Sequence, residues 1–167
     1  SDGWETVYIE NSGGSTNALG CWRKLWDGSE ASVSCYGGQG SGDGVAYGRI
    51  ILRESGNVRG SVVAATGTGT NPDPGQVSTT AGDCVLICAQ SAVSDTAPGS
   101  VSNYTTVNGN ANASTNDISL SIGYNLAPAS TENPAAWPSW SAGNWRALTI
   151  VIAPGVVGTL AATEAAD

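Results

Sequence analysis

The sequence predicts an all-β fold, an antiparallel two-sheet sandwich of jelly-roll type with about ten strands. Glycine supplies 23 of the 167 residues, and no long segment has the apolar spacing of a helix, which is typical of short strands joined by turns. Short alternating segments lie between clusters of Gly, Pro, Asn and Ser. One segment, residues 84–89, is apolar on both faces and follows a Gly-Asp turn. Because it has no polar face, we expect it at the centre of a sheet.

The other expected strands lie on both sides of this central segment. In chain order they span residues 4–10, 17–26, 31–36, 45–54, 60–66, 104–107, 117–124 and 144–153. In the second of these, Leu19 and Cys21 share one face and Trp22 lies on the other. Between Ile118 and Tyr124, large apolar residues alternate with Ser and Gly, so the small residues are expected to face outward. Residues 55–57, Ser-Gly-Asn, are expected to form a turn.

We expect one domain with a short tail. Residues 1–154 contain all the expected strands, and residues 126–143 form a long ordered loop with three Pro. Pro154-Gly155 ends the last strand. The remaining residues, 155–167, are rich in Ala and weakly patterned, which predicts a tail that is flexible or bound to a partner.

The charge of the chain argues against two classes of partner. The net charge is −8, and only six residues are Lys or Arg. An acidic surface without a basic stripe repels nucleic acid and anionic membranes, so neither is an expected partner. In addition, no apolar run approaches the roughly 20 residues of a membrane-spanning helix.

The four cysteines, Cys21, Cys35, Cys84 and Cys88, leave two interpretations open. None belongs to a Cys-x-x-Cys pair and the chain has no His, which argues against zinc. Cys84 and Cys88 are roughly 13 Å apart in an extended strand, too far to bond to each other. Cys21 and Cys35 lie seven residues to either side of Gly28. They are either a disulfide across a hairpin or two small buried apolar side chains.

The acidic residues predict neither catalysis nor a defined metal site. The fourteen carboxylates form no patterned pair, and general acid-base chemistry without His would depend on them or on Lys24. Asp43, Asp73 and Asp95 lie in loops and offer oxygen atoms to calcium, but their spacing matches no calcium-binding loop. Asp83 follows Gly82 and is expected to cap a turn. We therefore expect a protein that is not an enzyme and has no cofactor and no metal.

Aromatic residues in loops are the candidate contact residues. Trp137, Trp140, Tyr36 and Tyr104 lie in or near expected loops. Exposed aromatic rings would stack on a glycan or pack on a neighbouring subunit. The alternative is that the two tryptophans close the end of the core.

Four segments together resemble a known kind of domain. They are residues 2–6 (Asp-Gly-Trp-Glu-Thr), 22–30 (Trp-Arg-Lys-Leu-Trp-Asp-Gly-Ser-Glu), 79–83 (Thr-Thr-Ala-Gly-Asp) and 143–154. In this order they resemble a β-sandwich domain common in structural proteins of tailed bacteriophages. The resemblance implies a virion component (a tail, fibre or capsid-decoration protein) that acts in assembly or surface presentation. Its partners would be other virion proteins, and it implies no catalytic residues.

One departure from that resemblance bears on oligomerisation. Such domains usually have a further strand before the Gly-Trp motif, which here is already at residue 3. A sheet edge without its neighbour recruits strands from other chains, so we expect a homo-oligomer held partly by residues 156–167. The alternative function is a carbohydrate-binding module that recognises a glycan on the host surface.

Overall fold

The computed structural model is built from antiparallel β-strands. It describes residues 3–11, 18–24, 50–53, 55–58, 60, 62–92, 99–111, 118–138, 140, 143–154 and 161–164. All helical or extended structure in these ranges is strand, and every pair of neighbouring strands is antiparallel. The prediction of an all-β antiparallel fold is therefore confirmed.

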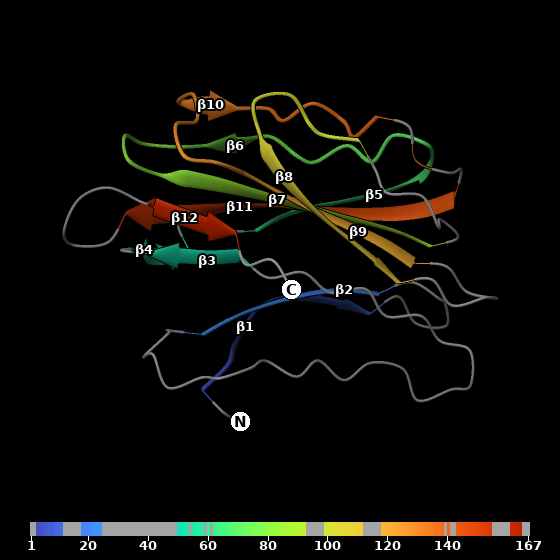
Figure 1. The fold of residues 1–167 in the computed structure, drawn as a ribbon, viewed down its shortest axis with the longest axis horizontal. Coiled ribbons are helices and arrows are strands. Elements are labelled where there is room, and N and C mark those ends of the chain that lie inside the picture. The colour runs from blue at the N-terminus through green and yellow to red at the C-terminus, as the bar shows by residue number, and fades with distance from the viewer. Residues whose placement is uncertain are drawn as a thin grey trace.

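The described strands divide among one large sheet and three two-stranded ones (Figure 1). The strands are β1 (Glu5–Asn11), β2 (Ala18–Arg23), β3 (Ile50–Arg53), β4 (Ser55–Val58), β5 (Val63–Gly69), β6 (Val77–Ser78), β7 (Cys84–Ala92), β8 (Thr105–Ala111), β9 (Ile118–Asn125), β10 (Thr131–Glu132), β11 (Gly143–Pro154) and β12 (Ala161–Glu164). The large sheet has the order β4-β11-β7-β9-β8. Strand β5 is a further strand of this sheet and, like β4, pairs with β11. The small sheets are β1-β2, β6-β10 and β3-β12.

Strand β7 lies at the centre of the large sheet, as its apolar pattern predicts. It pairs with β11 over residues 84–91 and with β9 over residues 85–92. Val85 and Ile87 are buried on one face, and Cys84 is buried on the other. A strand covered on both faces needs apolar side chains at odd and even positions alike. Covering layers therefore lie on both sides of the sheet.

The two layers that cover the central sheet differ in kind (Figure 1). On one face lies the β1-β2 ribbon, whose Leu19, Val7, Tyr8 and Cys21 pack against side chains of β7, β9 and β11. On the other face lie β6, β10 and their connecting segments, which bring Val77, Val101, Tyr104, Trp137 and Trp140 into a second apolar cluster. Residues from the expected long loop, 126–143, thus form part of the core.

This second layer corrects the expected orientation of β9. Ser119, Ser121 and Gly123 were expected to face outward, and the structure buries all three. At Ser121 the covering group is the indole of Trp137, whose Nε1 donates to Ser121 Oγ at 2.9 Å. At Gly123 a Cβ would lie 3.0 Å from Ile87 Cγ1 and 3.3 Å from Tyr104 Cβ, so no larger side chain fits without movement of these neighbours. Large and small residues alternate in β9 because both of its faces are covered and the two faces offer different amounts of space. The alternation does not mark a face exposed to water.

Two further expectations differ from the structure. Residues 55–57 were expected to turn, but they belong to β4, which pairs with β11. Residues 161–164 of the expected tail form β12, which pairs with β3 of the same chain. The expected strand at residues 31–36 lies outside the described residues.

Candidate functional site

The predicted contact residues Trp137 and Trp140 lie in the core. Their exposed fractions are 0% and 2%, and their rings stack with centroids 6.2 Å apart at an interplanar angle of 28°. Their backbone amides donate to the carbonyl oxygens of Pro72 (2.8 Å) and Thr70 (3.0 Å). The side chain of Asn71 donates to the carbonyl oxygen of Trp137 at 3.0 Å.

These bonds explain why a loop rich in Pro buries two indoles. The segment that contains residues 70–72 lies beside the loop and fixes its backbone, so both rings are held over the sheet. An exposed stacking platform at Trp137 and Trp140 is therefore wrong, and the core-packing alternative describes these residues. Their burial removes any direct contact with a glycan or a subunit.

The other two predicted aromatic residues do not form a surface site either. Tyr104 is buried, and its hydroxyl donates to Glu132 Oε1 at 3.0 Å. Burial raises the pKa of Tyr104, and the neighbouring charge of Glu132 raises it further. The other oxygen of this carboxylate accepts from the amide of Ala129 at 3.0 Å. Tyr36 lies outside the described residues.

The exposed aromatic side chains lie instead on the outer face of the β1-β2 ribbon. Four large apolar side chains are exposed among the described residues: Trp4, Ile9, Trp22 and Leu126. The first three belong to this ribbon and its start, with exposed fractions of 38%, 47% and 52%. The register opposes Thr6 to Trp22 and Ile9 to Gly20. We call Trp4, Thr6, Ile9, Gly20 and Trp22 the outer face.

Glycine at position 20 determines how Trp22 lies on this face. A Cβ atom at Gly20 would be 2.2 Å from Trp22 Cη2 and 2.7 Å from Cζ3. The indole therefore leans back along its own strand and lies directly over the Gly20 backbone. Since Ile9 is the cross-strand partner of Gly20, its side chain is next to the ring. Trp4 is two residues before Thr6, the cross-strand partner of Trp22, and residues two apart in an extended chain share a face. We call Trp4, Ile9 and Trp22 the apolar strip.

The sequence indicated which face of β2 contains Trp22 but not that this face is exposed. The alternation of β2 placed Trp22 opposite the core-facing Leu19 and Cys21, and the structure confirms that both pack inward. A glycine two residues before a tryptophan on the same face of a strand leaves room for the ring to lie flat. That spacing does not show whether Trp22 is exposed, because a tryptophan beneath a covering layer would have the same spacing.

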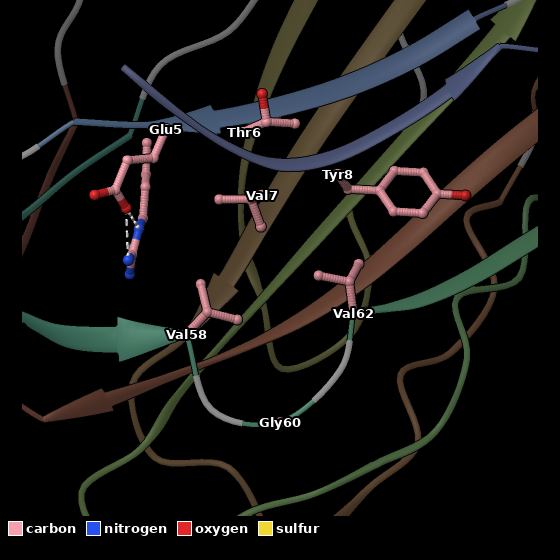
Figure 2. A pocket seen from close by; sticks show the side chains of 8 residues that line it. Glu5, Thr6, Val7, Tyr8, Val58, Gly60 and Val62 are labelled. Carbon is pink, nitrogen blue, oxygen red and sulfur yellow. Dashed lines mark hydrogen bonds and ion pairs between the residues drawn. The ribbon is translucent and has the colours of Figure 1, made fainter. Parts of the chain in front are cut away.

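A groove lies at one end of the ribbon, where it meets the connection from β4 to β5 (Figure 2). It has a volume of about 400 Å³ and is lined by Glu5, Thr6, Val7, Tyr8, Arg23, Val58, Gly60 and Val62. Three valines line its apolar part, and Figure 2 shows Val7 opposite Val58 and Val62. At its rim, Arg23 Nη2 lies 2.7 Å from Glu5 Oε2 and Arg23 Nε donates to the same oxygen at 2.8 Å.

The acidic residues have structural roles where the structure describes them. Asp83 is buried, and its Oδ2 accepts from the amide of Thr80 at 2.7 Å and from its hydroxyl at 3.1 Å. The prediction that Asp83 caps a turn is confirmed. Asp73 is exposed, while Asp43 and Asp95 lie outside the described residues. Within the described part of the chain, no three His, Cys, Asp or Glu side chains gather to hold a metal ion.

The cysteines lie on the ribbon side of the central sheet. Cys21, Cys84 and Cys88 carry free thiols, and Cys84 and Cys88 are extended along β7 and unbonded, as predicted. Burial raises the pKa of Cys84 to about 12. Cys35, the predicted partner of Cys21, lies outside the described residues.

No protein-family model, no curated protein and no solved structure matches the chain. Among the described residues there is no helix with the length and apolar character needed to cross a bilayer. The outer face is accordingly the candidate functional site on its geometry alone.

Proposed function

We propose that this protein is a non-enzymatic structural module that docks onto copies of itself through the outer face of the ribbon. The observation that carries the proposal is the exposed strip of Trp4, Ile9 and Trp22. Exposed apolar side chains are ordinary when scattered, whereas a contiguous strip marks a contact surface. Tryptophan is among the residues most enriched in such surfaces.

The distribution of charge is compatible with another copy of the chain as the occupant of the outer face. The chain carries a net charge of −8, so two copies repel each other over most of their surface. The outer face contains no carboxylate, and Lys24 Cε lies close to Gly3 at its margin. A contact there avoids placing like charges together and brings a cation towards an acidic neighbour.

The resemblance to domains of tailed-bacteriophage structural proteins supports a setting for this contact. In that setting the chain is a jelly-roll-type sandwich that decorates a capsid or builds a tail or fibre, with other virion proteins as further partners. A covered sheet with a protruding ribbon suits a repeating surface, since one rigid body presents one contact face. Electron microscopy of the native particle, with an antibody against this chain, tests its place there. Particles that bind no antibody would contradict the virion setting.

Sedimentation velocity at micromolar concentrations tests the docking face itself. We expect the wild-type chain to sediment as an assembly and Trp22→Ser to sediment as a monomer with an unchanged melting temperature. Leu126→Ser is the matched control, because Leu126 has the same exposed fraction as Trp4, 38%, and lies outside the outer face. A monomeric wild-type chain at high micromolar concentration, or equal effects of the two substitutions, would contradict docking through this face.

A carbohydrate-binding function is the second candidate, supported by the flat position of the Trp22 ring over Gly20. Sugar rings stack on exposed aromatic faces, and the acidic chain would select a neutral glycan. A glycan array distinguishes the two functions. Binding by a monomeric wild-type chain that Trp22→Ala abolishes would favour this candidate over self-assembly.

A further inference from the structure

Cys21 and Cys88 lie on facing layers of the same apolar cluster. Cys21 is on the inner side of β2, on the same side as Leu19, and Cys88 is on the ribbon side of β7. Both side chains are half-buried, whereas Cys84, four residues before Cys88 on the same face of β7, is fully buried. The two strands thus direct two thiols into one space between the layers.

The electrostatics of the thiols agree with this placement. Burial is the main cause of the raised pKa of Cys88, and the charge of Cys21 is the second. For Cys84, the charged neighbour that raises the pKa is Asp83. The charge of Cys21 thus acts on Cys88, which agrees with the placement of both side chains against the same apolar cluster.

We propose that Cys21 and Cys88 are the site of a disulfide bond that joins the β1-β2 ribbon to the central sheet. The structure shows the reduced form, with both thiols free. A disulfide between facing sheets is established geometry for β-sandwiches, since immunoglobulin domains contain one. The bond needs Cα atoms about 4.4–6.8 Å apart, so its formation requires β2 to come within that range of β7 at these two residues. This pairing replaces the Cys21–Cys35 pairing that hairpin symmetry suggested.

The oxidant is a low-molecular-weight disulfide such as oxidised glutathione. The thiolate of one cysteine attacks a sulfur of that disulfide, which releases one glutathione thiolate and leaves a mixed disulfide on the protein. The thiolate of the second cysteine attacks the protein sulfur and releases the second glutathione. Two protein thiols lose two protons and two electrons, and one glutathione disulfide becomes two thiols. Because burial raises the pKa of both thiols, the reaction should accelerate as the pH rises towards 9.

The bond would secure the layer that carries the proposed contact surface. The ribbon packs on the central sheet through apolar side chains such as Leu19 and Cys21, and the ion pair of Glu5 with Arg23 lies within the ribbon. A covalent link across a long loop restricts the unfolded chain and stabilises the folded one. This inference stands independently of the proposed function, because it concerns the inner side of the ribbon.

Peptide mapping of the full chain tests the pairing. The protein is incubated with oxidised glutathione at pH 8.5, alkylated and digested with trypsin. Cleavage after Arg23, Lys24, Arg49, Arg59 and Arg146 places Cys21 in peptide 1–23, Cys35 in 25–49, and Cys84 with Cys88 in 60–146. We expect peptide 1–23 to be linked to peptide 60–146.

Two variants assign the second cysteine. Cys84→Ala should keep the link and a rise of roughly 10 °C in melting temperature on oxidation, and Cys88→Ala should lose both. If either variant fails to fold, chymotrypsin cleavage after Leu86 separates Cys84 from Cys88 in the wild-type digest. A link between peptides 1–23 and 25–49, a link that persists in Cys88→Ala, or thiols that all remain alkylatable in the folded protein would overturn the proposal.

Discussion

Trp137 with Trp140 and Trp22 with its neighbours show two opposite uses of tryptophan in one chain. The first two lie in a long connection rich in Pro and are buried, whereas Trp22 lies in a regular strand and is half-exposed. Position in a loop or a strand therefore does not decide burial here. What decides it is whether another layer covers that face of the backbone. The loop itself is the second covering layer, and the ribbon is the first.

Replacing a buried tryptophan should have the largest effect on stability. Trp137→Ala removes a fully buried indole and its hydrogen bond to Ser121 Oγ. We expect a loss of about 3–5 kcal/mol in the free energy of unfolding, a large part of the total for a domain of this size. Denaturant titration followed by circular dichroism measures it.

Trp22→Ala is the matched control for this loss. It should cost about 1 kcal/mol or less, because the ring is half-exposed. Trp140→Phe adds a finer comparison, since no described group lies within hydrogen-bonding distance of Trp140 Nε1. It should cost less than Trp137→Phe. Equal losses for the exposed and the buried indole would mean that the ribbon is also covered.

Two glycines allow the same comparison without removing a ring. A Cβ at Gly67 would lie 2.3 Å from Cζ2 of the half-buried Trp145, and a Cβ at Gly20 would lie 2.2 Å from Trp22 Cη2. We expect Gly67→Ala to cost about 1–3 kcal/mol, because Trp145 packs against the core cluster and cannot move freely. Gly20→Ala should cost less than about 1 kcal/mol, because Trp22 can swing into solvent. Denaturant titration of both variants checks the order, and the reverse order would contradict it.

Much of the central sheet could be predicted, but the site could not. The double-sided apolar pattern of β7 identified its central position, and the alternation of β2 identified its inner face. The burial of Ser121 could not be derived from its own strand, because it depends on Trp137 in a distant segment. The exposure of Trp22 has the same origin, since only the three-dimensional arrangement shows which faces lack a covering layer.

A smaller effect should appear at alkaline pH on the side of the sheet that contains Trp137. The pKa of Tyr104 is raised by burial first and by Glu132 second, so the folded chain keeps a proton that the unfolded chain releases above about pH 10. Stability from this group is present below that pH and is lost as the pH rises. Tyr104→Phe should cost about 1 kcal/mol at neutral pH, through its hydrogen bond to Glu132, and should be less sensitive to alkali.

The quantity to measure is the difference in the free energy of unfolding between the wild-type protein and Tyr104→Phe at each pH. Burial raises the pKa of Cys84 to about 12, so this thiol also makes stability fall between about pH 9 and 12. It is present in both proteins and cancels in the difference. An unchanged difference in the free energy of unfolding from pH 8 to pH 11 would show that Tyr104 ionises in the folded protein.

The smallest effect is expected from the ion pair of the ribbon. Glu5 and Arg23 are cross-strand partners whose side chains are 66% and 40% exposed. Water screens such a pair, so a double-mutant cycle with Glu5→Gln and Arg23→Gln should give a coupling of about 0.2–1 kcal/mol that shrinks in 1 M salt. Leu19→Ala, on the inner side of the same ribbon, should cost several times more, because Leu19 packs in the apolar cluster between the layers. A coupling that exceeds the Leu19 effect, or one that salt leaves unchanged, would mean that the ribbon is held by charge. Apolar packing on the inner side of the ribbon would then not be what holds the exposed Trp22 in place.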